Sequence, residues 1–89
     1  MPVIDLMLFY VEQGAICTQT YGDINESFYR SITSVYTDAV RLAATIDDPE
    51  IYEPFRPRFV AVFQGFANFG WGVYDYMVDV YYNDFPSEI

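Results

Sequence analysis

The strongest constraint on the fold is an apolar seam that starts directly after a helix-start signal. Asp23-Ile24-Asn25-Glu26 forms a capping box, because the carboxylate at each end of this stretch can accept from the backbone N–H at the other end. From Phe28 to Ile46 the apolar residues follow an unbroken 4-3-4-3-4 spacing, which lines up one face that needs another helix to cover it. We predict a helix from this cap to about Thr45, whose inward row is Phe28, Ile32, Val35, Ala39, Leu42 and Ile46, widened by Tyr29, Tyr36, Val40 and Ala43.

The segment from about Val3 to Thr20 predicts another helix, because its apolar residues recur at three- and four-residue steps. The inward row is Ile4, Leu8, Val11, Ala15 and Thr18, beside a second stripe of Met7, Tyr10, Gly14 and Cys17, while Asp5, Glu12 and Gln19 mark the remaining face. Gly14 lowers helix propensity by about 1 kcal/mol relative to Ala. We interpret it as the site of a close helix crossing.

Three prolines cluster between Asp47 and Pro57 and separate these helices from the rest of the chain. Asp48-Pro49 is typical of an N-cap followed by proline at the first helical position, which predicts a single helical turn around Pro49 to Tyr52. Pro57 disfavours the helical conformation at Arg56 and sets a new start. We therefore expect a third helix from about Pro57 to Asn68, with Phe59, Val62, Phe63, Phe66 and Phe69 inward.

Gly70-Trp71-Gly72 follows, and it predicts either a glycine stop with a sharp re-entry or a strongly kinked single helix. A fourth helix from about Val73 to Asn83 would place Tyr74, Met77, Val78 and Tyr81 on one face and Asp75, Asp79 and Tyr82 on the other. Residues 1–89 therefore make a single domain, an all-α, up-down bundle of three to four helices.

The composition limits the partners of this bundle. Aromatic residues make up 20% of an 89-residue chain, which is more than one small core can hide, so we expect self-association to complete the bundle. Four arginines and no lysine stand against 13 acidic residues, giving a net charge of −9. No basic patch can form, which argues against binding to nucleic acids or to anionic membranes. The acidity instead fits a basic partner or mimicry of a nucleic-acid backbone.

The missing residue types exclude several kinds of chemistry. Without histidine, Ser-His and Cys-His nucleophile activation is impossible within the chain, and the single Cys17 cannot form an internal disulfide or a thiolate metal cage. We predict no cofactor and no metal, and the sequence favours a protein without catalysis. The longest charge-free run, residues 59–74, is too short to span a bilayer, and no basic region precedes the N-terminal apolar stretch, so we expect a cytoplasmic protein.

One candidate ligand site lies where the helix junctions of an up-down bundle meet. Tyr21, Asp23, Trp71 and Asp75 come from the two junctions that share one end, and together they could form an aromatic pocket for a cation or a peptide. Alternatively, Trp71 plugs the bundle end. Asp75 and Asp79, one turn apart, could chelate a hard cation, but a solvated acidic face explains them as well.

Three stretches, 5–12, 21–29 and 70–76, carry the tyrosine–glycine–aspartate turn and the Gly-Trp-Gly junction. In these the chain resembles a family of small helical proteins known only as a domain of unknown function. Members of that family carry a further, more basic helical segment ahead of this region, so the chain looks like the family's C-terminal half. The resemblance implies no activity, cofactor or catalytic residue. It does imply an apolar face that another copy or a separate helical protein would cover.

These observations predict a helical protein-interaction module that forms homo-oligomers and performs no catalysis. The first alternative is an acidic nucleic-acid mimic or an inhibitor of a basic partner. The second is a protein that binds a small ligand or a metal at the bundle end formed by Tyr21, Asp23, Trp71 and Asp75.

Overall fold

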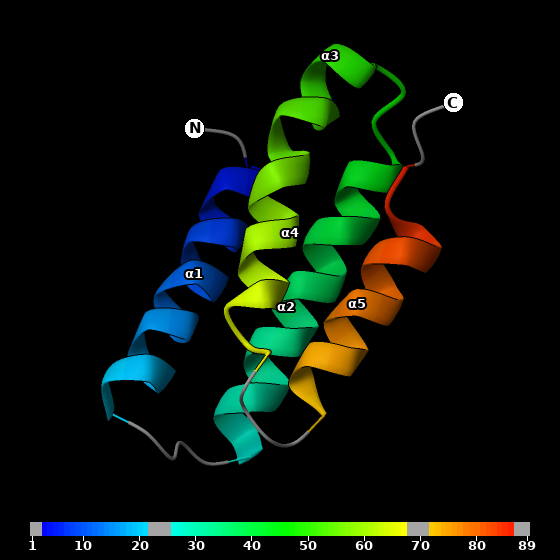
Figure 1. Cartoon of the computed structure of the whole chain (residues 1–89). Helices are drawn as coiled ribbons and strands as arrows, with labels where there is room; N and C mark the ends of the chain where they lie inside the picture. The colour runs from blue at the N-terminus through cyan, green and yellow to red at the C-terminus, as the bar shows by residue number, and fades with distance from the viewer. Residues whose placement is uncertain (1–2, 22–25, 68–71, 87–89) are drawn as a thin grey trace.

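The computed structural model describes residues 3–21, 26–67 and 72–86, and these fold as helices joined by short turns (Figure 1). The helices are α1 (Val3–Tyr21), α2 (Glu26–Ala44), the short α3 (Pro49–Tyr52), the 3₁₀ turn η1 (Glu53–Phe55), α4 (Arg56–Gln64) and α5 (Val73–Asp84). No strand occurs within the described ranges. The predicted all-α bundle is confirmed, and each predicted helix is present.

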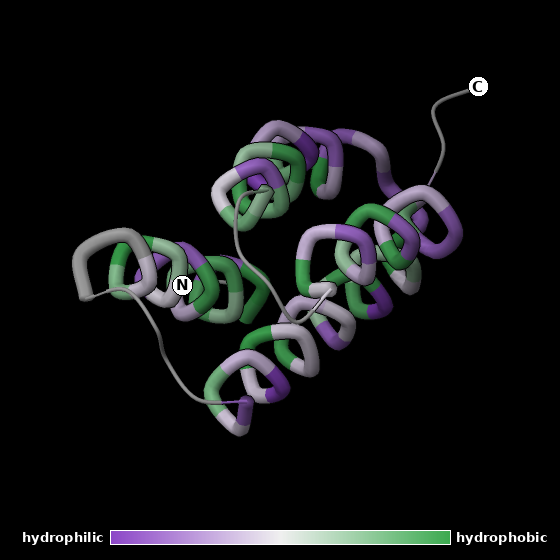
Figure 2. Tube along the Cα trace, turned by 60° about the horizontal axis from the view of Figure 1, so that its bottom comes forward, coloured by the Kyte–Doolittle hydropathy of each residue, from purple (hydrophilic) through white to green (hydrophobic). Residues whose placement is uncertain are grey.

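The four longer helices alternate in direction along the bundle (Figure 1). α1 packs against α2 and α4, and α5 packs against the same two helices. Viewed from the end, the four therefore form a square in which α1 and α5 occupy opposite corners (Figure 2). α3 and η1 cross the end of the bundle opposite the C-terminus of α1.

The inward row predicted for α1 is confirmed, since Ile4, Leu8, Val11, Ala15 and Thr18 are all buried. Gly14 marks the close crossing that the sequence predicts. A Cβ atom at this position would lie 3.1 Å from Cγ1 of Ile32 on α2 and closer still to Cδ1. The absence of a side chain at Gly14 is what lets α1 and α2 approach.

The buried face of α2 is turned relative to the predicted seam. In the predicted main row, Leu42 is exposed and Phe28 and Val35 are only partly buried. The residues predicted to widen this row to one side are all buried: Tyr29, Tyr36, Val40 and Ala43. α2 contacts α1 on one side and α5 on the other. The buried face of α2 is therefore centred between the predicted main row and the residues beside it, and not on the main row itself.

The proline-rich corner follows the prediction at its start. Asp48 adopts an extended conformation, and its carboxylate accepts from the backbone N–H of Glu50 at 3.0 Å, which caps α3.

The prediction for Arg56 is wrong. Arg56 is helical, with φ −51° and ψ −49°, although Pro57 follows it. Its guanidinium donates two hydrogen bonds to the Glu53 carboxylate, at 2.8 and 2.7 Å, and lies 4.7 Å from the centre of the Phe85 ring. These contacts outweigh the steric preference against a helical residue before proline.

α4 accordingly begins one residue earlier than predicted and ends at Gln64. Residues 65–67 continue as a turn, in which Phe66 is fully buried. Phe59, Val62 and Phe63 are buried as predicted, whereas Asn68 and Phe69 lie outside the described residues. On α5, Met77 and Tyr81 are buried and Asp75, Asp79 and Tyr82 are exposed, which confirms the predicted faces.

Candidate interaction surface

The predicted end site falls largely outside the described residues. Asp23 and Trp71 are not described, and Tyr21 closes α1 without a described side chain. Asp75 lies exposed in the first turn of α5. The four helix ends that flank both junctions do lie at one end of the bundle (Figure 1). A ligand site formed by Tyr21, Asp23, Trp71 and Asp75 stays a prediction.

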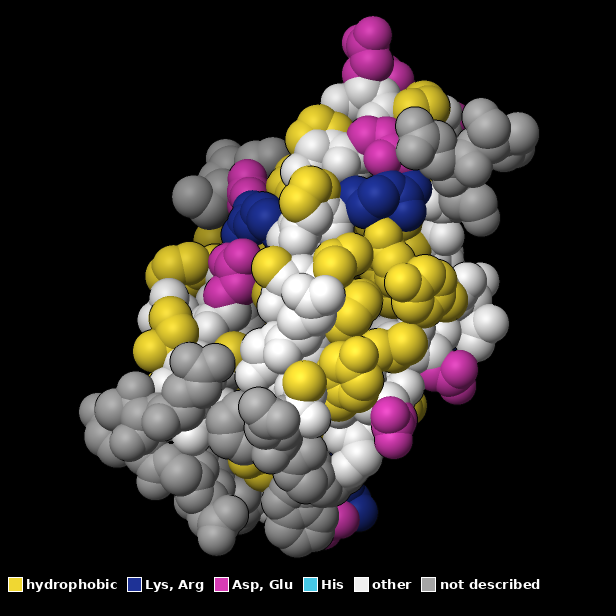
Figure 3. Space-filling model, in the orientation of Figure 1, with side chains coloured by type: hydrophobic (Ala, Val, Ile, Leu, Met, Phe, Trp, Pro, Cys, Tyr) yellow, Lys and Arg dark blue, Asp and Glu magenta, His cyan; other side chains and the backbone are white. Residues whose placement is uncertain are grey.

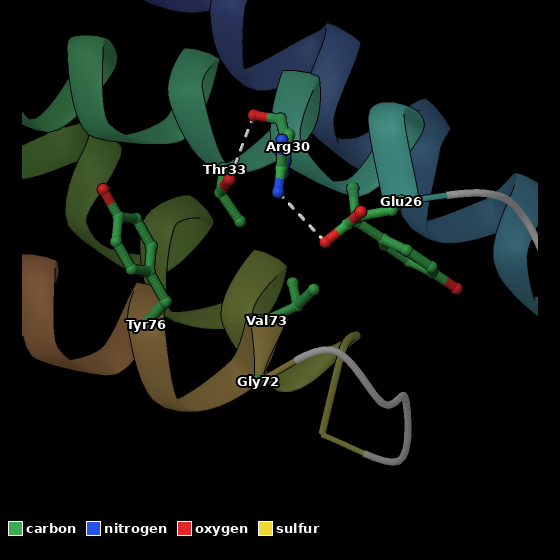
Figure 4. Close-up of a pocket in the computed structure, with 7 residues that line it drawn as sticks. Glu26, Arg30, Thr33, Gly72, Val73 and Tyr76 are labelled. Carbon is green, nitrogen blue, oxygen red and sulfur yellow. Dashed lines mark hydrogen bonds and ion pairs between the residues drawn. The ribbon is translucent and has the colours of Figure 1, made fainter.

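The described part of this end contains one small pocket of about 190 Å³ between α2 and α5 (Figure 4). Arg30 projects into it, but its guanidinium donates to Glu26 at 3.1 Å, and both side chains are more than half exposed to solvent. Gly72 forms the turn into α5 with a left-handed φ of 68°, which glycine adopts without strain. Because the one cation is already paired and the pocket is open, nothing in it is prearranged for chemistry. Its lining is Glu26, Tyr29, Arg30, Thr33, Gly72, Val73 and Tyr76.

Within the described ranges, no three Cys, Asp or Glu side chains gather closely enough to hold a metal ion. Asp75 and Asp79 both lie exposed on the outer face of α5.

A more informative feature is the outer face of α1, which is apolar where a surface helix is normally polar. Val3, Leu6, Phe9 and Ile16 are 59%, 54%, 57% and 53% exposed. They lie on the side of α1 away from the buried row. Figure 3 shows apolar side chains along the α1 edge of the molecule, interrupted by a basic group between acidic ones.

This stripe continues into a groove between α1 and α4 with a volume of about 430 Å³. Its floor is made of small residues. A Cβ atom at Gly65 would lie 3.4 Å from Cβ of Ala15, so α1 and the turn that follows α4 come close here. The groove is lined by Phe9, Glu12, Gln13, Ala15, Ile16, Ala61, Val62 and Gly65. A second hollow of about 310 Å³, lined by Asp5, Leu6, Phe9 and Arg58, lies on the other side of Phe9. Phe9 therefore forms a ridge between two recesses.

Arg58 joins α4 to α1 across this surface. Its guanidinium donates to Glu12 at 2.9 and 3.2 Å and also to Asp5. Hydrogen bonding to Glu12 and then to Asp5 raises the pKa of Arg58 against the opposing effect of desolvation. Arg56 pairs with the nearby Glu53, whereas Arg58 binds the two carboxylates of α1.

Arg58 shares its one positive charge with two carboxylates, so the cluster of Asp5, Glu12 and Arg58 carries one net negative charge. Arg56 does not offset this charge, because Arg56 pairs with Glu53 at the α3 corner. Most of the excess negative charge lies elsewhere, on α5 and on the α3 corner. We call the surface the α1/α4 face and define it by Leu6, Phe9, Gln13, Ile16, Arg58, Ala61 and Gly65.

The apolar periodicity of the sequence does not single out Leu6, Phe9 and Ile16. The signal for them is the low number of charges on α1: only two acids and no base occur in its 19 residues, so apolar side chains also lie outside the inward row.

Within the described ranges, no helix combines the length and the apolar character needed to cross a bilayer. Comparison with known protein families, curated protein sequences and solved structures finds no match to this chain. The resemblance to the family of unknown function therefore stays a prediction.

Proposed function

We propose that this protein is a non-catalytic interaction module that self-associates through the α1/α4 face. The observation that carries the proposal is the outer stripe of α1, on which Leu6, Phe9 and Ile16 are all more than half exposed beside an apolar groove. Contiguous exposed apolar surface of this kind marks interaction sites in soluble proteins. A second copy would remove it from water.

The size of the face lies at the lower limit for a specific dimer interface. α1 has 19 residues and α4 with its following turn has 12, so the two helices extend about 28 and 18 Å at a width of about 10 Å each. The footprint is then on the order of 450 Å² in projection, and a corrugated surface exposes more than its projection. Specific interfaces start at roughly 600 Å² per partner. α1 alone is too small, so α4 must take part.

The apolar surface, and not the charge, favours a second copy over a basic partner. Asp5 and Glu12 already hydrogen-bond Arg58, so a cationic partner would compete with this arginine, although the three groups together keep one negative charge. Outside this cluster the α1/α4 face is apolar, which makes it complementary to a second copy of itself. In the cytoplasm, where we place the protein as part of this proposal, the half-buried Cys17 would remain a free thiol.

The test compares two isoleucines of equal exposure, Ile16 in the α1/α4 face at 53% and Ile51 on α3 at 52%. Glutamine replaces each of them, because it keeps helix propensity while removing the apolar surface. Light scattering over a range of concentrations should show a dimer for the wild type and for Ile51→Gln, and dissociation at higher concentration for Ile16→Gln. A wild type that stays monomeric at every concentration, whether or not it binds a hydrophobic dye, would contradict the proposal.

A further inference from the structure

We infer that two copies of the chain pair about a twofold axis with their α1 helices antiparallel, so that Phe9 of each copy enters the α1/α4 groove of the other. The inference rests on the proposed self-association and specifies its geometry. It is carried by the close spacing of a ridge and a recess on one face of the molecule.

The ridge is Phe9, which is 57% exposed and borders both hollows. The recess lies further along α1, at the level of Glu12 to Ile16, with Ala61 and Gly65 on its α4 side. Phe9 thus precedes the recess by one to two helical turns, about 5 to 10 Å along the axis. Both belong to the same surface.

A twofold interface requires that the same patch contacts itself. A rotation axis that crosses α1 near Glu12 would place each Phe9 over the other copy's recess, because that axis lies midway between the two features. The ridge would fill the recess because the recess is lined by the small residues Ala15, Ala61 and Gly65. The interface closes after two copies, since ridge and recess are both used.

The charges near such an axis oppose pairing only weakly. Glu12 and Arg58 lie closest to it, and they are hydrogen-bonded to each other within each copy at 2.9 Å. Asp5 also accepts from Arg58, so each copy brings one net negative charge to the interface and not two bare carboxylates. Amphipathic helices of other proteins could enter the groove as well, but a partner with cationic residues would compete with Arg58 for these carboxylates.

Two variants separate the ridge from the recess. Phe9→Ala removes the ridge, which is also one wall of the recess, but keeps the floor of small residues. Ala61→Trp fills the recess from within the chain while keeping the ridge. Ala61 is exposed on α4, so the larger side chain has room in the monomer. Each variant alone should dimerise about 100-fold more weakly than the wild type, because both of its ridge-to-recess contacts are lost.

Mixing the two variants gives the decisive result. One contact is restored in the mixed pair, since the Phe9 of the Ala61→Trp chain can enter the open recess of the Phe9→Ala chain. Sedimentation equilibrium of the equimolar mixture should then show association about 10-fold tighter than for either variant alone. Tyr82→Ala, a 71% exposed aromatic on α5, and Ala44→Trp, at an exposed alanine of α2, are matched controls that should keep the wild-type dissociation constant.

The outcomes distinguish this geometry from self-association in general. If the wild type is dimeric but Ala61→Trp dimerises equally well, or if the mixture shows only the average of its two components, the geometry is wrong and the proposed function stands. If the wild type is monomeric, or if a hydrophobic dye occupies the groove of a monomer, both fall. Circular dichroism verifies folding, and Ala61→Leu replaces Ala61→Trp if the latter does not fold.

Discussion

Replacing Tyr36 by phenylalanine should destabilise the protein at neutral pH and stabilise it, relative to the wild type, in strong alkali. Tyr36 is fully buried on α2, its ring packs edge-on against Phe59 at 5.6 Å, and its hydroxyl donates to the backbone oxygen of Phe59 at 3.1 Å. The substitution keeps the ring contact and removes this hydrogen bond. A buried neutral hydrogen bond contributes about 1 kcal/mol, so the free energy of unfolding at pH 7 should fall by about that amount.

The alkaline effect has the opposite sign. Burial, and to a lesser extent the neighbouring Tyr81, raises the pKa of the Tyr36 hydroxyl well above its usual value. An unfolded tyrosine ionises near pH 10, so above that pH the unfolded chain releases a proton that the folded protein retains. Wild-type stability is therefore unaffected by this group below about pH 10 and then falls by about 1.4 kcal/mol per pH unit. The variant lacks this loss, so the two stability curves should cross at about pH 10.6.

The assay is urea unfolding followed by circular dichroism at pH 7, 9, 10, 10.5 and 11, at one protein concentration because association would shift the midpoint. Tyr82→Phe is the control, since its 71% exposed side chain meets water in both states and the substitution should change neither the stability nor its pH dependence. Curves for the wild type and Tyr36→Phe that stay parallel from pH 7 to 11 would refute the reasoning about burial.

Three further substitutions test the packing. Gly14→Ala should destabilise the protein by about 1–3 kcal/mol in chemical unfolding, although alanine has the higher helix propensity, because the new Cβ overlaps Ile32. Adding Ile32→Val removes the nearest atom and should recover most of the lost stability. Arg56→Lys should lower the free energy of unfolding by about 1–2 kcal/mol, since an ammonium group cannot keep both the paired hydrogen bonds to Glu53 and the contact with the Phe85 ring. An unchanged unfolding midpoint would show that the proline-rich corner does not depend on these contacts. Asp48→Ala should lower the free energy of unfolding by about 1 kcal/mol through loss of the α3 cap, whereas Asp48→Asn should keep most of the stability.

The sequence predicts the helices well because their signals are local. The apolar row of α1, the Asp48 cap and Gly14 all act within one helix or at one crossing, and all are found in the structure. The exact buried face of α2 is less predictable, since it depends on having neighbours on two sides. Arg56 shows the same limit, because its helical conformation depends on Phe85, which is distant in sequence.

The candidate surface is harder to predict than the fold because it is defined by what remains after packing. Leu6, Phe9 and Ile16 are as apolar as the residues of the buried row, and only the placement of α2 and α4 decides which side of α1 is left exposed. The groove needs a further condition, the close approach of Gly65 to Ala15, which no pattern in either helix signals alone.

The net charge of −9 and self-association are compatible because most of the charge lies away from the proposed interface. Asp75, Asp79 and Asp84 belong to α5, in the layer behind α1 and α4. In a dimer joined through the α1/α4 face, the two α5 helices would be separated by three interhelical spacings, about 25–30 Å. At physiological salt the screening length is about 8 Å, so their repulsion is small, whereas at 10 mM salt the screening length is about 30 Å and the repulsion is only partly screened. The dimer should therefore weaken as salt is removed, which sedimentation at the two salt concentrations measures. Pairing through complementary charges would respond in the opposite direction and would contradict an interface formed by apolar contacts.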